Sequence, residues 1–320
     1  MAGPAAAPIV TVVGSYAVGL TIVVERAPVG GETVIGAGYE EGPGGKGSNQ
    51  AIQAARLGAD VALVAVVGAD RFAQEARAMW EAEGVDTTYV ASCDGLATGV
   101  GFIVVEASGE NRIVLDLGAN GRLSRASVDA AAERIARSQV VLVQFEVPTE
   151  AAIAAIAGAR AAGAISILNP APARPLPDHA LAMIDVLTPN ETELRVLAGR
   201  RSNDDAGDPL EDGRMLVRRG VGAVVLTRGA AGALIIRADS ALALPALPID
   251  VIDTTGAGDA FNGALAVGLT MRMTLPDAVR MAIVAGALAC TRRGVVPALP
   301  TAAELVAAGV DCSRLPAARS

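Results

Sequence analysis

Gly256, Gly258 and Asp259 stand close together in the polar stretch 253–259, directly before the long apolar segment 260–269. Glycines allow the backbone to turn tightly, so the free N–H groups of a following helix converge on one point and can bind an anion. Asp259 adds a proton acceptor within the same turn. Phosphoryl transfer to a hydroxyl needs both parts, because donors stabilise the transferring group and a base orients or deprotonates the attacking oxygen. The residues equally fit a plain helix start, where an acidic side chain interacts favourably with the dipole.

A second glycine-rich stretch, residues 42–50, precedes the helical pattern 51–57. Gly42, Gly44 and Gly47 match G-x-G-x-x-G, but a dinucleotide-binding loop follows directly on a buried strand, whereas residues 38–41 are charged and glycine-flanked. Lys46 does not complete a Walker A loop, because Gly47 stands where serine or threonine is required. The stretch therefore favours neither of these nucleotide-binding motifs.

Lys46 stands at the start of that helix, where its charge opposes the helix dipole. This placement indicates either an anionic or polyhydroxylated partner or simply a solvated lysine. Asn49 and Gln50 add amide groups suited to the recognition of hydroxyl groups.

Polar residues also follow several apolar, β-prone segments. Glu146 comes just after 140–143, where ligands of open α/β sheets gather, although it also fits the start of the next helix. Asn190 and Glu193 have the spacing of a capping box, and the same two groups could hold Mg²⁺ through water beside a nucleotide's phosphates. The strand at 224–226 runs into a loop with Gly229 and Gly232, which fits either a nucleotide-lining loop or a hairpin turn.

Apolar β-prone segments alternate with amphipathic helical segments, which predicts parallel βαβ units and a doubly wound sheet covered on both faces. Strands are expected at 9–13, 61–67, 140–143 and 165–168, and helices at 71–83, 125–137 and 149–162. Residues 16–24 and 33–39 are predicted to form a small sheet outside the main core, and 98–105 and 112–115 are β-prone. Because no linker separates two domains, residues 1–320 are expected to form one α/β domain.

Composition excludes several classes of function. With 52% hydrophobic and 19% charged residues, the chain can bury a large core, and its formal charge of -8 argues against nucleic acid or an anionic membrane as partner. His179 is the single histidine, which excludes multi-histidine metal sites. Cys93, Cys290 and Cys312 are widely spaced and odd in number, as expected in a reducing compartment. Residues 1–24 carry no charge, but they contain no basic n-region of the kind that begins a signal peptide, and prolines interrupt them. They therefore predict a buried first strand, and we expect a cytoplasmic protein.

Six motifs, in this order, resemble the ribokinase branch of the phosphofructokinase-B-type sugar kinases over about residues 9–305: GPGGKGSNQA at 42–51, NPAPA at 169–173, TPNETE at 188–193, TRGAAG at 227–232, DTTGAGDAFNGAL at 253–265 and TRRG at 291–294. The resemblance implies a Rossmann-like, doubly wound α/β sheet with a small β lid inserted at about 16–40 and 98–116. It also implies ATP-dependent transfer to the terminal hydroxyl of a small pentose-like sugar, with Mg²⁺ and K⁺, and a homodimer formed through the lid.

The resemblance assigns roles to individual residues. Asp259 is implied to be the base, and the amides of Gly256, Ala257 and Gly258 the anion hole. Three further sets follow from the same matching: Gly45, Lys46, Asn49 and Glu146 for the sugar; Asn190, Glu193, Thr227, Gly229 and Gly232 for the nucleotide and its Mg²⁺; and Asp253, Thr255, Ala289, Arg292 and Gly294 for a monovalent-cation loop that acts largely through backbone carbonyls.

This chain departs from the ribokinase pattern at two places. Ribokinases carry Asn-x-Asp after the Gly-Ser of the first strand, and this chain has Ala17 and Gly19 at those positions. A site that lacks partners for a substrate's hydroxyl groups discriminates against that substrate by on the order of 10²-fold or more, which favours a less hydroxylated or differently shaped sugar. Ala298 stands where the family often has serine in the cation loop, so weaker potassium activation is expected.

Three functions remain open from the sequence. The leading hypothesis is an ATP-dependent sugar kinase of ribokinase type. A nucleoside kinase is the alternative within enzymes, although the 2% aromatic content supplies few stacking partners for a base. A sugar-binding sensor without catalysis is the third, and the intact Asp259 and its glycines argue against it.

Overall fold

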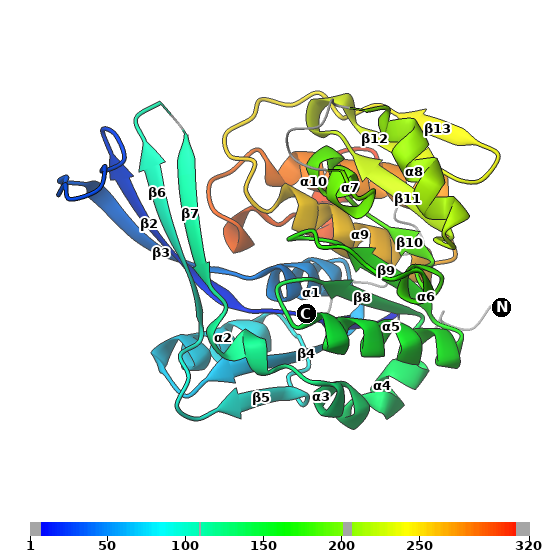
Figure 1. Cartoon of the computed structure of the whole chain (residues 1–320), viewed down its shortest axis with the longest axis horizontal. Helices are drawn as coiled ribbons and strands as arrows, with labels where there is room; N and C mark the ends of the chain where they lie inside the picture. The colour runs from blue at the N-terminus through cyan, green and yellow to red at the C-terminus, as the bar shows by residue number, and fades with distance from the viewer. Residues whose placement is uncertain (1–7, 109, 201–206, 312–320) are drawn as a thin grey trace.

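The computed structural model describes residues 8–108, 110–200 and 207–311, so Cys312 lies outside the described residues. Within these ranges one nine-stranded sheet has the order β13-β12-β11-β10-β9-β8-β1-β4-β5 (Figure 1). The strands from β11 to β5 pair in parallel, whereas β12 and β13 are antiparallel. Their bounds are β1 Ile9–Val13, β4 Asp60–Gly68, β5 Val90–Cys93, β8 Val140–Gln144, β9 Ile165–Asn169, β10 Val186–Leu187, β11 Ala223–Thr227, β12 Ala233–Ile236 and β13 Ala241–Leu244.

Helices cover both faces of this sheet, as the alternating pattern predicts. Val10 and Val12 of β1 pack into one apolar cluster, and Val13 packs into the other. A parallel strand buried on both faces is apolar throughout, which is why residues 9–13 contain a single polar residue. The first face carries α1 Lys46–Arg56, α2 Arg71–Ala82, α9 Ala257–Thr270, α10 Leu275–Ala289 and α11 Ala302–Ala307; the second carries α3 Arg125–Ala130, α4 Ala132–Arg137, α5 Thr149–Ala162, α6 Asp178–Leu181, α7 Glu191–Leu197 and α8 Pro209–Arg218.

The helix expected over 125–137 is divided in two, which corrects the sequence prediction. Ala131 has φ −97° and ψ 11°, outside the helical region, and separates α3 from α4. Val128, Ala131 and Ile135 all lie in the same buried cluster on either side of the division. None of the helices in the described ranges combines the length and apolar character that a bilayer span requires.

A second sheet of four strands, in the order β3-β2-β6-β7, projects from the main body (Figure 1). Its strands are β2 Ala17–Val24, β3 Ala37–Gly44, β6 Gly99–Glu106 and β7 Asn111–Asp116. The strand expected over 33–39 begins later and continues to Gly44, so Gly42 and Gly44 lie in a strand. Pro43 is tolerated there because β3 is an edge strand, where a missing N–H costs no ladder bond. Since β3 belongs to this outer sheet, the G-x-G-x-x-G match does not follow a buried parallel strand.

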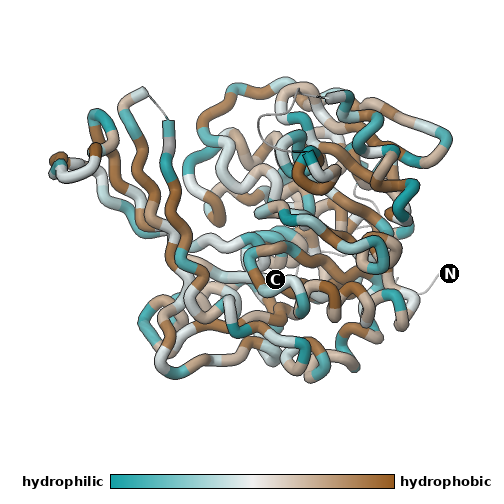
Figure 2. Tube along the Cα trace, viewed as in Figure 1, coloured by the Kyte–Doolittle hydropathy of each residue, from teal (hydrophilic) through white to brown (hydrophobic). Residues whose placement is uncertain are grey.

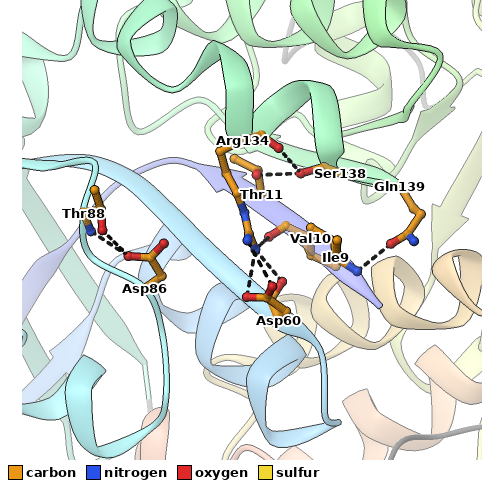
Figure 3. Close-up of polar contacts among 9 residues, drawn as sticks. All are labelled: Ile9, Val10, Thr11, Asp60, Asp86, Thr88, Arg134, Ser138 and Gln139. Carbon is orange, nitrogen blue, oxygen red and sulfur yellow. Dashed lines mark hydrogen bonds and ion pairs between the residues drawn. The ribbon is translucent and has the colours of Figure 1, made fainter. Parts of the chain in front are cut away.

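Arg134 joins α4 to the amino ends of β1 and β4 (Figure 3). Its guanidinium donates to both carboxylate oxygens of Asp60 at 3.1 Å and to the Asp60 carbonyl at 2.7 Å. The Oγ atom of Ser138 donates to the Arg134 carbonyl at 2.9 Å and lies 2.8 Å from the Thr11 hydroxyl. Arg134 is only 8% exposed, so these bonds replace the water that its charge loses.

Arg134→Met is expected to lower the free energy of unfolding by about 1–3 kcal/mol, because the Asp60 carboxylate loses its partner. The value lies below that for a fully buried pair, since Asp60 keeps 31% of its side-chain exposure. Urea unfolding measures it. Arg125→Met removes the exposed pair with Asp129 and should change stability by less than about 0.5 kcal/mol. Equal losses of unfolding free energy in the two variants would contradict a stabilising role for the buried Arg134–Asp60 pair.

Candidate active site

The amino ends of α1 and α9 meet above the carboxyl ends of β8 and β9, the edge at which open α/β sheets bind ligands. Gly256 is the N-cap of α9 and has φ +83°, a left-handed conformation that favours glycine. Its missing side chain also leaves room for Val295, because an added Cβ would lie 2.7 Å from that residue's Cγ1. The sequence prediction of a tight turn into this helix is correct.

The first turn of α9 offers backbone donors to an anion. The N–H of Ala257 donates to the Thr254 carbonyl at 3.3 Å, and that of Asp259 donates to the Gly256 carbonyl at 3.0 Å. Among the described residues no backbone carbonyl accepts from Gly256 or Gly258, so these two N–H groups are the ones left to meet a ligand. Free N–H groups at a helix N-terminus are suited to binding a phosphoryl group.

Asp259 is 5% exposed and lies between two amide side chains of α1. The Nδ2 group of Asn49 donates to its Oδ2 at 2.8 Å, and the Nε2 group of Gln50 donates to its Oδ1 at 2.9 Å. For Gln50 this corrects the expectation of hydroxyl recognition, because its NH₂ group donates to Asp259 and Asn169 and its Oε1 accepts from Gln144. Asn49 still has an acceptor to offer, because its Oδ1 is buried and has no partner within the described ranges.

Lys46 begins α1 in surroundings that are acidic. Attraction to Asp259, and more weakly to Glu146 and Glu193, raises the pKa of the Lys46 ammonium against the opposing effect of burial. Glu146 accepts the backbone N–H of Lys46 at 2.9 Å and the hydroxyl of Ser15 at 2.6 Å through the same oxygen. These charges explain a lysine at a helix start, where the dipole alone disfavours it.

Asn190 and Glu193 form the capping box that their spacing predicts, at the start of α7. The backbone N–H of Asn190 donates to Glu193 Oε2 at 2.9 Å, and that of Glu193 donates to Asn190 Oδ1 at 2.8 Å. Burial raises the pKa of the Glu193 carboxyl, and the Lys46 charge opposes this. The box uses Oε2, so Oε1 is the oxygen placed to meet a hydrated cation, and one carboxylate with water ligands fits Mg²⁺.

The loop after β11 is a hairpin turn, which is one of the two interpretations of its sequence, and it also lines a cavity. Strands β11 and β12 are antiparallel, and the N–H of Arg228 donates to the Gly232 carbonyl at 2.8 Å. Thr227 is bridged to Asn190, which brings the two predicted nucleotide segments together. The cavity, of about 550 Å³, has the size of a small-molecule site, and its lining includes Thr227, Gly229, Gly232, Ala257, Gly258 and Phe261.

Asp253 ties the loop before α9 to the segment after α10. Its Oδ1 accepts the N–H of Thr255 at 2.9 Å and its Oδ2 accepts the N–H of Gly294 at 3.1 Å. Partial burial pushes the pKa of the Asp253 carboxyl upward, but these hydrogen bonds hold it below its usual value. Ala289 is the buried last residue of α10, whose carboxyl end presents carbonyl oxygens and a negative dipole suited to a monovalent cation.

Arg292 does not join this loop through its side chain, because it pairs with Glu304 of α11. The ranges that the structure describes hold no group of three or more His, Cys, Asp or Glu side chains arranged for a metal ion.

A set of buried polar residues beneath Asp259 is absent from the sequence prediction. Gln144 and Asn169 are the last residues of β8 and β9, and Thr188 follows β10. The Thr188 hydroxyl donates to Asn262 Oδ1 at 2.6 Å, and Asn262 Nδ2 donates to the Gly258 carbonyl at 2.8 Å. A polar residue directly after an apolar strand is the signal that could have indicated them.

The sheet order, the projecting sheet and the buried aspartate at a glycine-started helix define an α/β kinase fold of the ribokinase type. A family model described as pfkB family carbohydrate kinase matches residues 9–302, and the chain belongs to this family. The chain is 36% identical to a ribokinase of Haemophilus influenzae, over 92% of this chain and 96% of that protein. It is 35% identical to a deoxyribokinase of Salmonella typhi, over 91% of this chain and 95% of that protein. A structure of Arabidopsis thaliana ribokinase complexed with ribose and ATP superposes with TM-score 0.86 at 29% identity, covering 94% of this chain and 98% of that one.

Proposed function

We propose that this carbohydrate kinase transfers the γ-phosphoryl group of ATP to the terminal hydroxyl of a pentose-like sugar, with Asp259 as the base. One observation carries the proposal. A buried carboxylate lies in the same helical turn as two unengaged backbone donors, one of which, Gly258, lines a cavity of about 550 Å³. We further propose that the whole chain acts as one kinase domain, with the projecting sheet as a lid.

The acceptor sugar lies between Lys46, Asn49 and Glu146 in this proposal. The buried Oδ1 of Asn49 accepts one sugar hydroxyl, while its Nδ2 keeps Asp259 in place. Asp259 takes the proton of the attacking hydroxyl, and the N–H groups of Gly256 and Gly258 stabilise charge on the transferring phosphoryl group.

The nucleotide occupies the cavity beside Thr227, Gly229 and Gly232. Asn190 and Glu193 hold Mg²⁺ through water, and the ion neutralises charge on the phosphates when it is bound. The carbonyl groups near Ala289, with the loop that Asp253 organises, hold K⁺. Ala298 is fully buried and brings no hydroxyl to that loop.

The projecting sheet presents few hydrogen-bonding side chains where it meets the main body. Ala17 of β2 is paired with Gly44 and Gly99, and Gly19 of the same strand is paired with Gly42 and Gly101. A sugar with fewer hydroxyl groups than ribose leaves fewer of them without a hydrogen-bond partner beside Ala17 and Gly19. We therefore propose that 2-deoxyribose is used at least as efficiently as ribose, as the similarity to both a ribokinase and a deoxyribokinase allows.

Coupled ATP turnover with Mg²⁺ and K⁺, over ribose, 2-deoxyribose, other pentoses, fructose and nucleosides, tests this proposal. The expected result is a kcat/KM for 2-deoxyribose equal to or above that for ribose. The double change Ala17→Asn and Gly19→Asp should then favour ribose by about 10-fold or more, because it restores polar partners. Preference for a nucleoside would favour the alternative enzyme class, and no turnover of any compound would favour a sugar-binding sensor.

We propose a homodimer formed through the projecting sheet. Phe102 and Val114 are paired across β6 and β7 and are 53% and 69% exposed. Figure 2 shows hydrophobic colouring along the strands of this sheet. A contiguous apolar surface of this kind is typical of an interaction site. The free thiols Cys93 and Cys290 support the proposal of a reducing, cytoplasmic location.

A further inference from the structure

A chain of buried amides leads from the main sheet to Asp259. The Nε2 group of Gln144, at the end of β8, donates to Gln50 Oε1 at 2.5 Å. The Nε2 group of Gln50 donates to Asp259 Oδ1 at 2.9 Å and to Asn169 Oδ1 at 3.0 Å. Gln50 and Gln144 are both 0% exposed, so water does not compete for these bonds.

The chemistry of the groups fixes the direction of every bond in this chain. An ionised carboxylate only accepts hydrogen bonds, so Gln50 must turn its NH₂ group toward Asp259. Its Oε1 then faces Gln144, which must donate. A buried network with one permitted orientation holds its members rigidly.

We propose that Gln50 is a positioning residue for Asp259, and that Gln144 keeps it in place. Gln50 fixes Oδ1 and Asn49 fixes Oδ2, so the carboxylate cannot rotate and its remaining lone pairs stay aimed at the acceptor hydroxyl. The inference rests on the proposed role of Asp259 as the base. Gln50 contributes to the transition state only through Asp259 and leaves sugar binding to other groups.

The same helix supplies a matched control for the loss of a buried amide. Gln53 lies one turn further along α1, is also 0% exposed, and donates to the Pro300 carbonyl at 3.0 Å. Removing its amide deletes a buried hydrogen bond of similar length without changing a contact to Asp259. A purely structural role for Gln50 predicts that kcat falls only in proportion to stability in both variants, with the larger loss of stability at Gln50, whose side chain makes three hydrogen bonds against one at Gln53.

Steady-state kinetics of Gln50→Leu and Gln53→Leu make the first comparison. Gln50→Leu is expected to lower kcat by about 10- to 100-fold with the KM for the sugar changed less than about 3-fold, because a hydrogen bond to a charged group is lost. Both variants are expected to lower the melting temperature, Gln53→Leu by less because it loses one buried hydrogen bond, but Gln53→Leu is expected to keep kcat within about 3-fold. Equal kcat losses in the two variants would overturn the proposal.

A double-mutant cycle with Asp259→Asn separates the inference from the function on which it rests. If Gln50 acts through the carboxylate, Gln50→Leu causes no further loss of kcat in the Asp259→Asn protein. The same fold loss in both backgrounds would show a structural role for Gln50. Full turnover by Asp259→Asn alone would instead refute the base assignment.

Gln144→Leu gives a second test that leaves the contacts of Asp259 in place, and it serves if Gln50→Leu fails to fold. It is expected to lower kcat by about 3- to 10-fold at unchanged sugar KM, since Gln50 loses its support. An unchanged kcat in this variant would contradict the proposed chain of amides.

Discussion

Asp259→Asn is expected to lower kcat by about 10²- to 10⁴-fold, because the variant lacks the general base that we propose for the acceptor hydroxyl. The effect should fall on kcat more than on the KM for either substrate, since Asp259 acts in the transition state. The new amide would also turn an NH₂ group toward Asn49 or Gln50, which both donate to this position. Stability measured by urea unfolding should therefore fall by about 1–3 kcal/mol.

Asp277→Asn is the matched control for the loss of a carboxylate in a helix's first turn. Asp277 is the third residue of α10, as Asp259 is of α9, and it follows the N-cap Thr274. It is exposed at the surface, and among the described residues its side chain pairs with the N-cap Thr274 and with Arg280 of the same helix. Its replacement should leave kcat unchanged. If both variants kept full turnover, Asp259 would be no more than a helix-start residue.

Gly45→Ala is expected to lower the free energy of unfolding by about 2–4 kcal/mol and to abolish most activity. Gly45 has φ +84°, where a side chain costs about 1–2 kcal/mol. An added Cβ would also lie 2.5 Å from the Tyr16 Cα atom, which forces the backbone of one segment to move. The shift displaces Lys46, the next residue, from Glu146. Urea unfolding and ATP turnover measure the two effects.

Gly42→Ala provides the comparison in the same glycine-rich stretch. An added Cβ at Gly42 meets no atom within 4 Å, and the residue lies in the edge strand β3. This change should alter stability by less than about 0.5 kcal/mol. A loss as large as that of Gly45→Ala would mean that the stretch is sensitive to any side chain, not to backbone conformation.

The regular elements were largely predictable because local pattern and burial agree. Strand 9–13 and helix 149–162 have the predicted bounds, since each is a continuous apolar or amphipathic run ended by turn residues. Strand β3 was misplaced because its sequence is rich in glycine and charge. Pairing with β2, not strand propensity, determines its structure.

The sequence indicated which residues belong to the candidate site, but not which of them contact one another. Asp259 and the glycines before it form a local motif, so their placement in one turn followed from the sequence. Asn49 touches Asp259 from 210 positions away, and no spacing rule carries that information. For Asn190 and Glu193 the sequence correctly predicted the local structure but not the function. Their capping box forms whether or not the pair also holds a cation.

Strand β3 ends at Gly44 and α1 begins at Lys46, so a single residue separates the projecting sheet from the helix. That helix carries Asn49 and Gln50, whose side chains donate hydrogen bonds to Asp259. With one residue between them, we expect a tilt of the outer sheet to move the start of α1 as well. In the proposed kinase, closure of this sheet over a sugar would therefore also move Asn49 and Gln50 and change the alignment of Asp259.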